Sequence, residues 1–204
     1  MGDVAVTVPG GAVRLLLDGE LALLPTDTVY GIAAAAGCAA ACERLYALKS
    51  RPASQATAIM LGSVDGLTAA LPELGGRALA ACRRLLPGAV TVIVENPAHR
   101  FAHACGARTD RIGVRVPRLA PAVAGLADDA GGLVITSANL RGGPDPARLA
   151  DVPGALRRAA AFAVDGGALP GLPSSVIDVT GERPVVLREG PDLGGVLAAL
   201  GGDA

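Results

Sequence analysis

The feature that most restricts the fold of this chain is an irregular alternation of short apolar segments with helix-type patterns, punctuated by glycine and proline. The apolar segments have the length of strands rather than of buried helices. The pattern predicts strands at 21–24, near Ile32, and at 58–61, 90–94, 112–116, 133–136, 162–164, 176–179 and 185–187. It predicts helices at 13–18, 39–49, 77–86, 121–130, 153–160 and 193–200. Because strands and helices interleave without strict alternation, we expect a mixed, twisted α/β sheet rather than a barrel or a doubly wound repeat.

The length of 204 residues suits a single domain. We therefore predict one domain spanning 1–204, with its core at about residues 11–200. Half of the residues are apolar, but the chain has only two Phe, two Tyr and no Trp. The core must therefore consist of Leu, Val, Ala and Ile.

Charge and cysteine usage exclude several classes of protein. A net charge of −1 gives no general attraction to nucleic acid or to an anionic membrane. A weak RNA contact would need a local patch, for which the candidates are Arg108, Arg111, Arg115 and Arg118. The four cysteines form no metal-binding spacing, so we expect buried, reduced thiols. With no signal peptide and no membrane-span pattern, the expected location is the cytoplasm, with no membrane partner.

Lys49 is the only lysine in a chain that has seventeen arginines. Pro52 cannot continue the preceding helix, so Lys49 and Arg51 should project where that helix ends. A lysine offers a compact charge with three movable donors, whereas an arginine offers a rigid fork. A site that binds phosphate oxygens can require the former. The alternative is a solvated surface lysine.

Polar residues are scarce, and they gather where predicted strands end. In open α/β sheets, such loops form the usual ligand crevice. Cations beside hydroxyls and an amide suit a polyphosphate, although the chain has neither a P-loop motif nor a Rossmann glycine motif. Each group also has a structural alternative: a turn at 26–28 and at 165–167, a helix cap at 137–139, and a surface pair of Arg188 with Glu189. The polar residues concerned are Thr26, Asp27, Thr28, Tyr30, Lys49, Arg51, Gln55, Ser137, Asn139, Ser174, Ser175 and Arg188.

The ordered set of motifs resembles the YrdC/TsaC family of threonylcarbamoyl-AMP synthases, in its short single-domain form. The resemblance runs from about residue 15 to residue 200. The motifs are LPTDTVYG at 24–31, KSRP at 49–52, LPGAVT at 86–91, GVRVP at 113–117, SAN at 137–139, DGG at 165–167, SSVID at 174–178 and VLREG at 186–190.

The resemblance implies a YrdC-like twisted α/β fold with a large concave, positively lined cavity. It also implies an enzyme that converts L-threonine, bicarbonate and ATP to L-threonylcarbamoyl-AMP and pyrophosphate. A tRNA threonylcarbamoyl transferase system would then pass the threonylcarbamoyl group to tRNA. By motif position, ATP would contact Lys49, Arg51, Gln55, Asn139 and Arg188. Threonine would contact Thr28, Arg115, Ser137 and Ser174, with Arg115 binding the carboxylate. The catalytic set would be Lys49, Arg51, Ser137 and Asn139.

The reaction needs no protein nucleophile, because its difficulty lies in bringing two anions together. Mg²⁺ should accompany ATP, but no carboxylate cluster suggests a metal held by the protein. This chain departs from the usual family pattern at Ala56, Thr57, Met60, Ala147, Pro173 and Ser175. Two alternatives therefore stay open. One is a paralogue that applies the same ATP and carbamate chemistry to another small substrate. The other is a non-catalytic RNA-binding domain.

Overall fold

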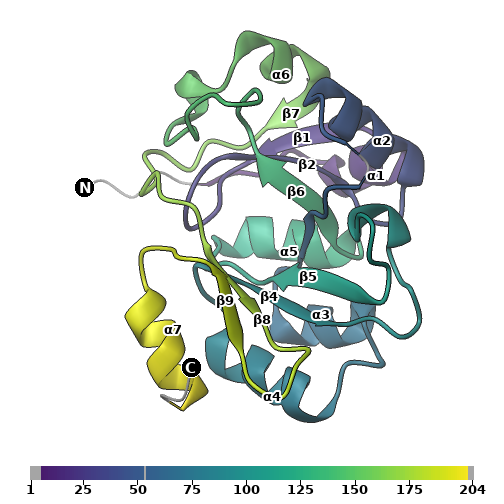
Figure 1. The fold of residues 1–204 in the computed structure, drawn as a ribbon. Helices are drawn as coiled ribbons and strands as arrows, with labels where there is room; N and C mark the ends of the chain where they lie inside the picture. The colour runs from purple at the N-terminus through teal and green to yellow at the C-terminus, as the bar shows by residue number, and fades with distance from the viewer. Residues whose placement is uncertain (1–5, 53, 202–204) are drawn as a thin grey trace.

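The computed structural model describes residues 6–52 and 54–201, and this part of the chain forms a nine-stranded sheet (Figure 1). The strand order is β7-β1-β2-β6-β3-β5-β4-β8-β9. The strands are β1 Leu21–Leu24, β2 Gly31–Ala35, β3 Ala58–Met60, β4 Val90–Glu95, β5 Arg111–Arg115, β6 Leu133–Ser137, β7 Ala160–Ala163, β8 Ser175–Asp178 and β9 Val185–Arg188. The pairs β1/β7, β3/β5 and β4/β8 are parallel and the other neighbours are antiparallel. The predicted mixed α/β sheet is confirmed.

Helices flank this sheet, and six of the seven in the described chain lie close to where the sequence predicts them, whereas the helix at 64–70 is not predicted. They are α1 Ala12–Leu17, α2 Ala39–Leu48, α3 Val64–Ala70, α4 Gly76–Leu85, α5 Pro121–Asp129, α6 Gly154–Ala159 and α7 Leu193–Leu200, with short 3₁₀ turns η1 Ala102–Ala104 and η2 Leu149–Asp151. Local chemistry explains several boundaries. Ser63 caps α3 by accepting a hydrogen bond from Gly66 N at 2.8 Å, and Pro121 opens α5 at a position where its missing N–H costs nothing.

Strand side chains alternate between two cores, as the period of two residues requires. On β2, Ile32 and Ala34 pack into the larger core, which includes α2 and α4. Ala33 and Ala35 point to the opposite face, where α1 and α5 cover the sheet. Both cores consist almost wholly of Leu, Val, Ala and Ile, as the composition predicts.

In the β4–β5 region the same alternation separates the core from a pocket. Val92 and Val114 are fully buried in the larger core. Their neighbours Thr91, Gly113 and Arg115 instead line a pocket on the opposite face of the sheet. Polar and small residues at alternate positions of two buried strands therefore form the floor of the pocket.

The four cysteines are free thiols that differ in burial. Cys42, Cys82 and Cys105 are buried free thiols, as expected, and burial raises the pKa of Cys42 to about 12. Cys38 is only partly buried, because it precedes α2 at the N-cap position. Within 6–52 and 54–201, no helix combines the length and hydropathy that a membrane crossing needs.

Candidate active site

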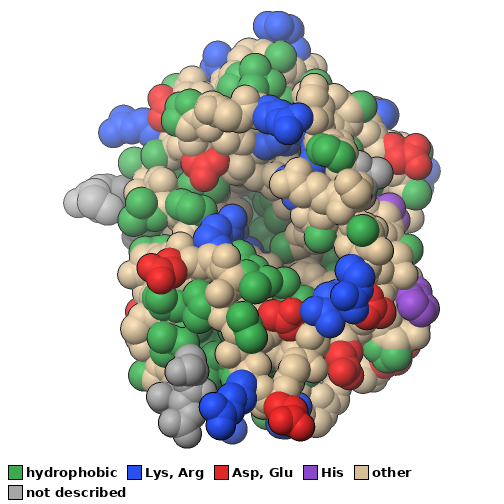
Figure 2. All heavy atoms as spheres, viewed as in Figure 1, with side chains coloured by type: hydrophobic (Ala, Val, Ile, Leu, Met, Phe, Trp, Pro, Cys, Tyr) green, Lys and Arg blue, Asp and Glu red, His purple; other side chains and the backbone are tan. Residues whose placement is uncertain are grey.

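One pocket brings together most of the residues that the sequence singles out. It has a volume of about 440 Å³, within the range of small-molecule sites. Figure 2 shows it as a hollow near the middle of the face, bordered by basic side chains. Six of the predicted residues line it: Thr28, Arg51, Arg115, Ser137, Ser174 and Arg188.

Lys49 lies beside the pocket and connects the end of α2 to the end of β6. It occupies the C-cap position of α2, and its side chain is buried, with only 8% of the residue exposed. Its Nζ donates to the Ser137 carbonyl and, at 2.8 Å, to Asn139 Oδ1. Burial, reinforced by the neighbouring charge of Arg51, lowers the pKa of Lys49 to about 8. The alternative of a solvated surface lysine is therefore wrong.

Asn139 is held at four points. Its Oδ1 accepts from Lys49 Nζ and from Ser137 Oγ, each at 2.8 Å. Its Nδ2 donates to the Gly143 carbonyl at 2.7 Å and to Asp145 Oδ1 at 3.0 Å. The predicted grouping of Lys49, Ser137 and Asn139 is thus present in the fold. Segment 137–139 is not a helix cap, since it leads from β6 into a loop.

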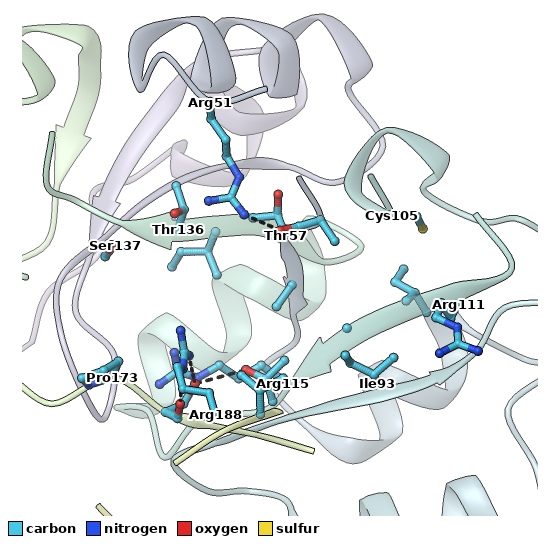
Figure 3. A pocket seen from close by; sticks show the side chains of 18 of the residues that line it. Arg51, Thr57, Ile93, Cys105, Arg111, Arg115, Thr136, Ser137, Pro173 and Arg188 are labelled. Atoms are coloured by element: carbon cyan, nitrogen blue, oxygen red, sulfur yellow. Dashed lines mark hydrogen bonds between the residues drawn. The ribbon is translucent and has the colours of Figure 1, made fainter. Parts of the chain in front are cut away.

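Arg51 closes the short loop after α2 and points into the pocket (Figure 3). Its guanidinium donates to the Ala56 carbonyl and more weakly, at 3.4 Å, to the Gln55 carbonyl. Partial burial lowers its pKa. Gln55 contributes only backbone groups to this turn. Its side chain is exposed and lies outside the pocket lining.

The opposite wall is built around Arg115, at the end of β5. Arg115 Nη2 donates to Asp27 Oδ1 and to Thr28 Oγ1, both at 2.6 Å. The 26–28 segment is also a turn, in which Thr26 Oγ1 accepts from Thr28 N and Val29 N. The turn therefore presents both an anion and a hydroxyl to Arg115. Among the described residues, Arg115 Nε is buried and has no hydrogen-bond partner.

Arg188 lies beside Arg115 on this wall, as Figure 3 shows. It donates from Nε to the Ser174 carbonyl at 2.8 Å and from Nη2 to Ser174 Oγ at 3.1 Å. Its pKa is lowered, first by partial burial and then by Arg115. Arg188 therefore connects β9 to the segment before β8, and the described chain has no ion pair between Arg188 and Glu189.

Two of the motifs support the pocket from outside. Tyr30 Oη donates toward Asp165 Oδ1 and the Gly167 carbonyl, both at 2.9 Å, and accepts from Gly166 N at 2.8 Å. A Cβ at Gly166 would lie 2.6 Å from Pro25 Cβ, so only glycine fits there. At 165–167 no backbone turn is assigned, but Asp165 Oδ1 accepts from Gly167 N at 2.8 Å, the local hydrogen bond of an Asx-type turn. The Tyr30 hydroxyl joins this segment to the end of 26–30.

The arginine patch considered for RNA is largely neutralised. Arg108 pairs with Asp110 at 2.6 Å, Arg111 with Asp178 at 2.9 Å, and Arg115 with Asp27 at 2.6 Å. Arg118 completes that patch, but no ion pair of its side chain is found in the described chain. The patch therefore offers little free positive charge to a phosphate backbone.

The positions that depart from the usual family pattern have different environments. Ala56, Thr57 and Pro173 line the pocket. Thr57 Oγ1 donates to Tyr46 Oη at 2.8 Å and so does not point freely into the pocket. Met60 is fully buried in the smaller core, and Ser175 Oγ accepts from Gly190 N at 3.1 Å. Ala56 and Pro173 are therefore the departures best placed to change substrate choice.

A residue that sequence reasoning did not single out also belongs to the site. Asp145 lines the pocket and accepts from Asn139 Nδ2. Its signal in the sequence is weak, because it lies in a Gly/Pro-rich connection that reads as a linker. With regard to metals, no group of three or more His, Cys, Asp and Glu side chains able to hold an ion is found among the residues the structure describes.

Known proteins are similar to this chain in sequence and in fold. A relative from Mycobacterium tuberculosis (strain H37Rv) is 32% identical over 185 residues, which cover 88% of this chain and 82% of that protein. The threonylcarbamoyl-AMP synthase of Bacillus subtilis (strain 168) is 30% identical over 183 residues, covering 88% of this chain and 52% of that protein.

Two solved structures superpose closely. Sua5 of Pyrococcus abyssi, complexed with L-threonine, has a TM-score of 0.83 at 28% identity and covers 93% of this chain and 56% of that one. YciO of Escherichia coli has a TM-score of 0.78 at 25% identity and covers 91% of each chain. The chain thus spans about half the length of the Bacillus and Pyrococcus proteins. The Sua5/YciO/YrdC family model, described as telomere recombination, matches residues 14–190, and the chain therefore belongs to the Sua5/YciO/YrdC family.

Proposed function

We propose that this chain is a threonylcarbamoyl-AMP synthase, which makes L-threonylcarbamoyl-AMP and pyrophosphate from L-threonine, bicarbonate and ATP. The observation that carries the proposal is the division of one pocket into two cationic walls. One wall is lined by Arg51, with the hydrogen-bonded Lys49 and Asn139 directly beside the pocket, and the other wall is lined by Arg115 and Arg188. A substrate that joins a carboxylate or carbamate to a triphosphate needs two such walls.

The proposed reaction proceeds in two steps. The threonine amine attacks the carbon of CO₂ and loses a proton, or attacks bicarbonate with cleavage of a C–O bond and release of water; either route forms the N–C bond of a carbamate. A carbamate oxygen then attacks the α-phosphorus of ATP, and the bond to the β-phosphate oxygen breaks, releasing pyrophosphate. The protein contributes position and positive charge, which together can supply a large part of a rate enhancement.

The roles follow from the electrostatics of each wall. Lys49 donates to neutral oxygens, so its charge is not cancelled by an ion pair and is available to phosphate. Arg115 keeps a buried Nε without a partner in the described chain, which suits a carboxylate oxygen. Thr28 and Ser174 add hydroxyls on the same wall, and Ser137 stands between the two walls. Gln55 is proposed to contact the nucleotide from its exposed position next to Arg51.

Mg²⁺ bound to the triphosphate would neutralise phosphate charge and orient the leaving group. Asp145 is the one carboxylate among the described residues that line the pocket. This donor set fits a metal that arrives with the nucleotide better than one caged by the protein.

The proposal extends to the setting of the enzyme. We propose that residues 1–204 act as one domain in the cytoplasm, with no membrane partner. The product would pass to a tRNA threonylcarbamoyl transferase system, and any direct contact of this chain with tRNA would be weak.

A single assay tests the function. The protein is incubated with ATP, bicarbonate and threonine, the adenylate is sought by mass spectrometry, and pyrophosphate is measured across a panel of amino acids. Threonine-dependent adenylate is the expected result. Turnover with another amino acid but not with threonine would favour a paralogue that applies the same chemistry to another small substrate. Ala56 and Pro173, which line the pocket, are the residues that could cause such a change of substrate. RNA binding with steep salt dependence and no ATP turnover would favour the RNA-binding domain.

A further inference from the structure

Asp145 occupies an unusual position for a carboxylate in a site that must bind anions. It lies between β6 and η2, in a segment with no regular secondary structure, and lines the pocket together with Arg51 and Arg188. A carboxylate there repels phosphate, so its presence needs a compensating role.

The first observation is the orientation of the Asn139 amide. Asn139 Nδ2 donates hydrogen bonds to two acceptors on the loop, the Gly143 carbonyl at 2.7 Å and Asp145 Oδ1 at 3.0 Å. The amide oxygen must then face Lys49 Nζ and Ser137 Oγ. A reversed amide would turn its N–H donors toward the Lys49 ammonium and its oxygen toward two acceptors, so the hydrogen bonds with Lys49, Gly143 and Asp145 would be lost and only the contact with the Ser137 hydroxyl could persist. The loop acceptors thus select the orientation that holds Lys49.

The second observation is the distribution of charge around Lys49. Arg51 disfavours the charged form of Lys49, whereas Asp145 favours it. Asp145 also favours the charged form of Arg188 and so raises its pKa, whereas Arg115 lowers that pKa. Asp27, the acid on the opposite wall, is already paired with Arg115 and also accepts a hydrogen bond from Arg118 N at 3.0 Å. Asp145 is therefore the counter-charge between the two walls.

We propose that Asp145 is a positioning residue of the ATP site, which orients the Asn139 amide and keeps the Lys49 ammonium charged and directed at the phosphates. This inference rests on the function proposed above. It differs from a metal-binding role, in which Asp145 would bind Mg²⁺ and have no effect on Lys49.

Because Lys49 is the only lysine, it can be observed directly. Protein grown with ¹³C-lysine gives a single Cε signal, whose shift against pH reports the protonation of Lys49 without any need for activity. The variants are Asp145→Asn, which keeps an oxygen acceptor but removes the charge, and Asp145→Ala, which removes both. Asp151→Asn, on the exposed 3₁₀ turn η2 of the same connection, is the matched control.

We expect both Asp145 variants to move the Lys49 midpoint below the wild-type value of about 8, and Asp151→Asn to leave it unchanged. At neutral pH, kcat should fall roughly ten-fold in Asp145→Ala, the scale of one lost charge-assisted hydrogen bond, while the threonine KM changes little. In Asp145→Asn the kcat ratio to wild type should recover as the pH is lowered, because Lys49 regains its proton.

An unchanged Lys49 midpoint in both Asp145 variants would overturn the proposal. If that result came with a raised Mg²⁺ requirement, Asp145 would be a metal ligand instead. If the Asp145 variants shifted the Lys49 midpoint but the wild-type protein made no adenylate, the result would count against the proposed function and support the positioning role. The two failures are therefore distinguishable.

Discussion

Lys49 and Arg115, on opposite sides of the pocket, are held in opposite ways. Lys49 is bound by neutral oxygens, the Ser137 carbonyl and the Asn139 amide, and its pKa is low. Arg115 is paired with Asp27, and the two side chains are only 11% and 10% exposed. A buried cation without a paired anion is costly to the fold, whereas a paired one is rigid and largely neutralised. The first arrangement leaves the charge of Lys49 available to a ligand, and the second fixes the orientation of the Arg115 guanidinium, whose Nε has no partner in the described chain.

Removing the unpaired charge should have the largest effect. Lys49→Ala should lower turnover by roughly 10²-fold or more, the scale of losing a preorganised charge donor. Lys49→Arg should not restore it, because a planar fork cannot replace a compact ammonium. Steady-state kinetics measure the loss, and thermal melting should show that the fold survives. If Lys49→Ala turned over at the wild-type rate, Lys49 would have no role in the proposed reaction, and the comparison of Lys49 with Arg115 would have no functional meaning.

Removing the paired charge should affect one substrate more than the other. Arg115→Ala should raise the threonine KM by roughly ten- to a hundred-fold, corresponding to about 1.5–3 kcal/mol for a lost charged hydrogen bond, with a smaller change in the ATP KM. The same change leaves Asp27 buried without its cation, which costs about 3–5 kcal/mol of stability.

Asp27→Asn is the matched control for this stability effect, because it breaks the same ion pair but keeps the guanidinium in the pocket. It should lower stability while leaving the threonine KM much closer to that of the wild type. Equal effects of Arg115→Ala on both substrates would place Arg115 on the triphosphate or in a purely structural role.

How much of this could be predicted from the sequence differs between the two walls. Local signals placed the Lys49 wall well: Pro52 ends α2, and the apolar run 133–136 leads directly into Ser137. The pairing of Arg115 with Asp27 could not be predicted, because 88 positions separate the two residues and only the sheet order brings them together.

Asp145 escaped prediction for a different reason. A residue in an irregular loop has no periodicity to place it. Its partner Asn139 belongs to the motif at 137–139, which does not extend to Asp145. Gln55 illustrates the reverse limit: it is the only glutamine of the chain and its motif position implies a contact with ATP, yet its side chain is exposed outside the pocket. Rarity identifies a candidate but does not give the direction of a side chain.

The contrast between the walls can be sharpened with pH. The pKa of Lys49 lies at about 8, below its usual value of 10.5, because the charged form is desolvated. Lys49 is therefore charged below about pH 8 and loses its proton as the pH rises through that value. Phosphate groups have already lost their last proton in this range, since their second pKa is about 6. ATP affinity should then fall as the pH rises from about 7 to about 9.5.

Calorimetric titration of ATP at several pH values measures this effect. Lys49→Ala is the control, and its weaker affinity should be independent of pH over the same window. If the wild type and Lys49→Ala had parallel pH profiles, the dependence would belong to another group.

The smallest effect should come from outside both walls. Tyr30 Oη meets Asp165, Gly166 N and the Gly167 carbonyl, and so connects the turn that carries Asp27 and Thr28 to the loop after β7. Tyr30→Phe keeps the ring but leaves these partners unsatisfied, which should lower the free energy of unfolding by about 1–3 kcal/mol. Chemical denaturation measures that loss. Tyr30→Phe removes only the hydroxyl contacts with 165–167 and leaves the backbone hydrogen bonds of Tyr30 with Ala138 and Pro146 intact. We therefore expect a modest rise in the threonine KM and no change in ATP affinity. A loss of ATP affinity equal to the rise in threonine KM would mean that the two walls move as one unit. The walls would then differ in how they hold their charges, but a structural change in one would also alter binding at the other.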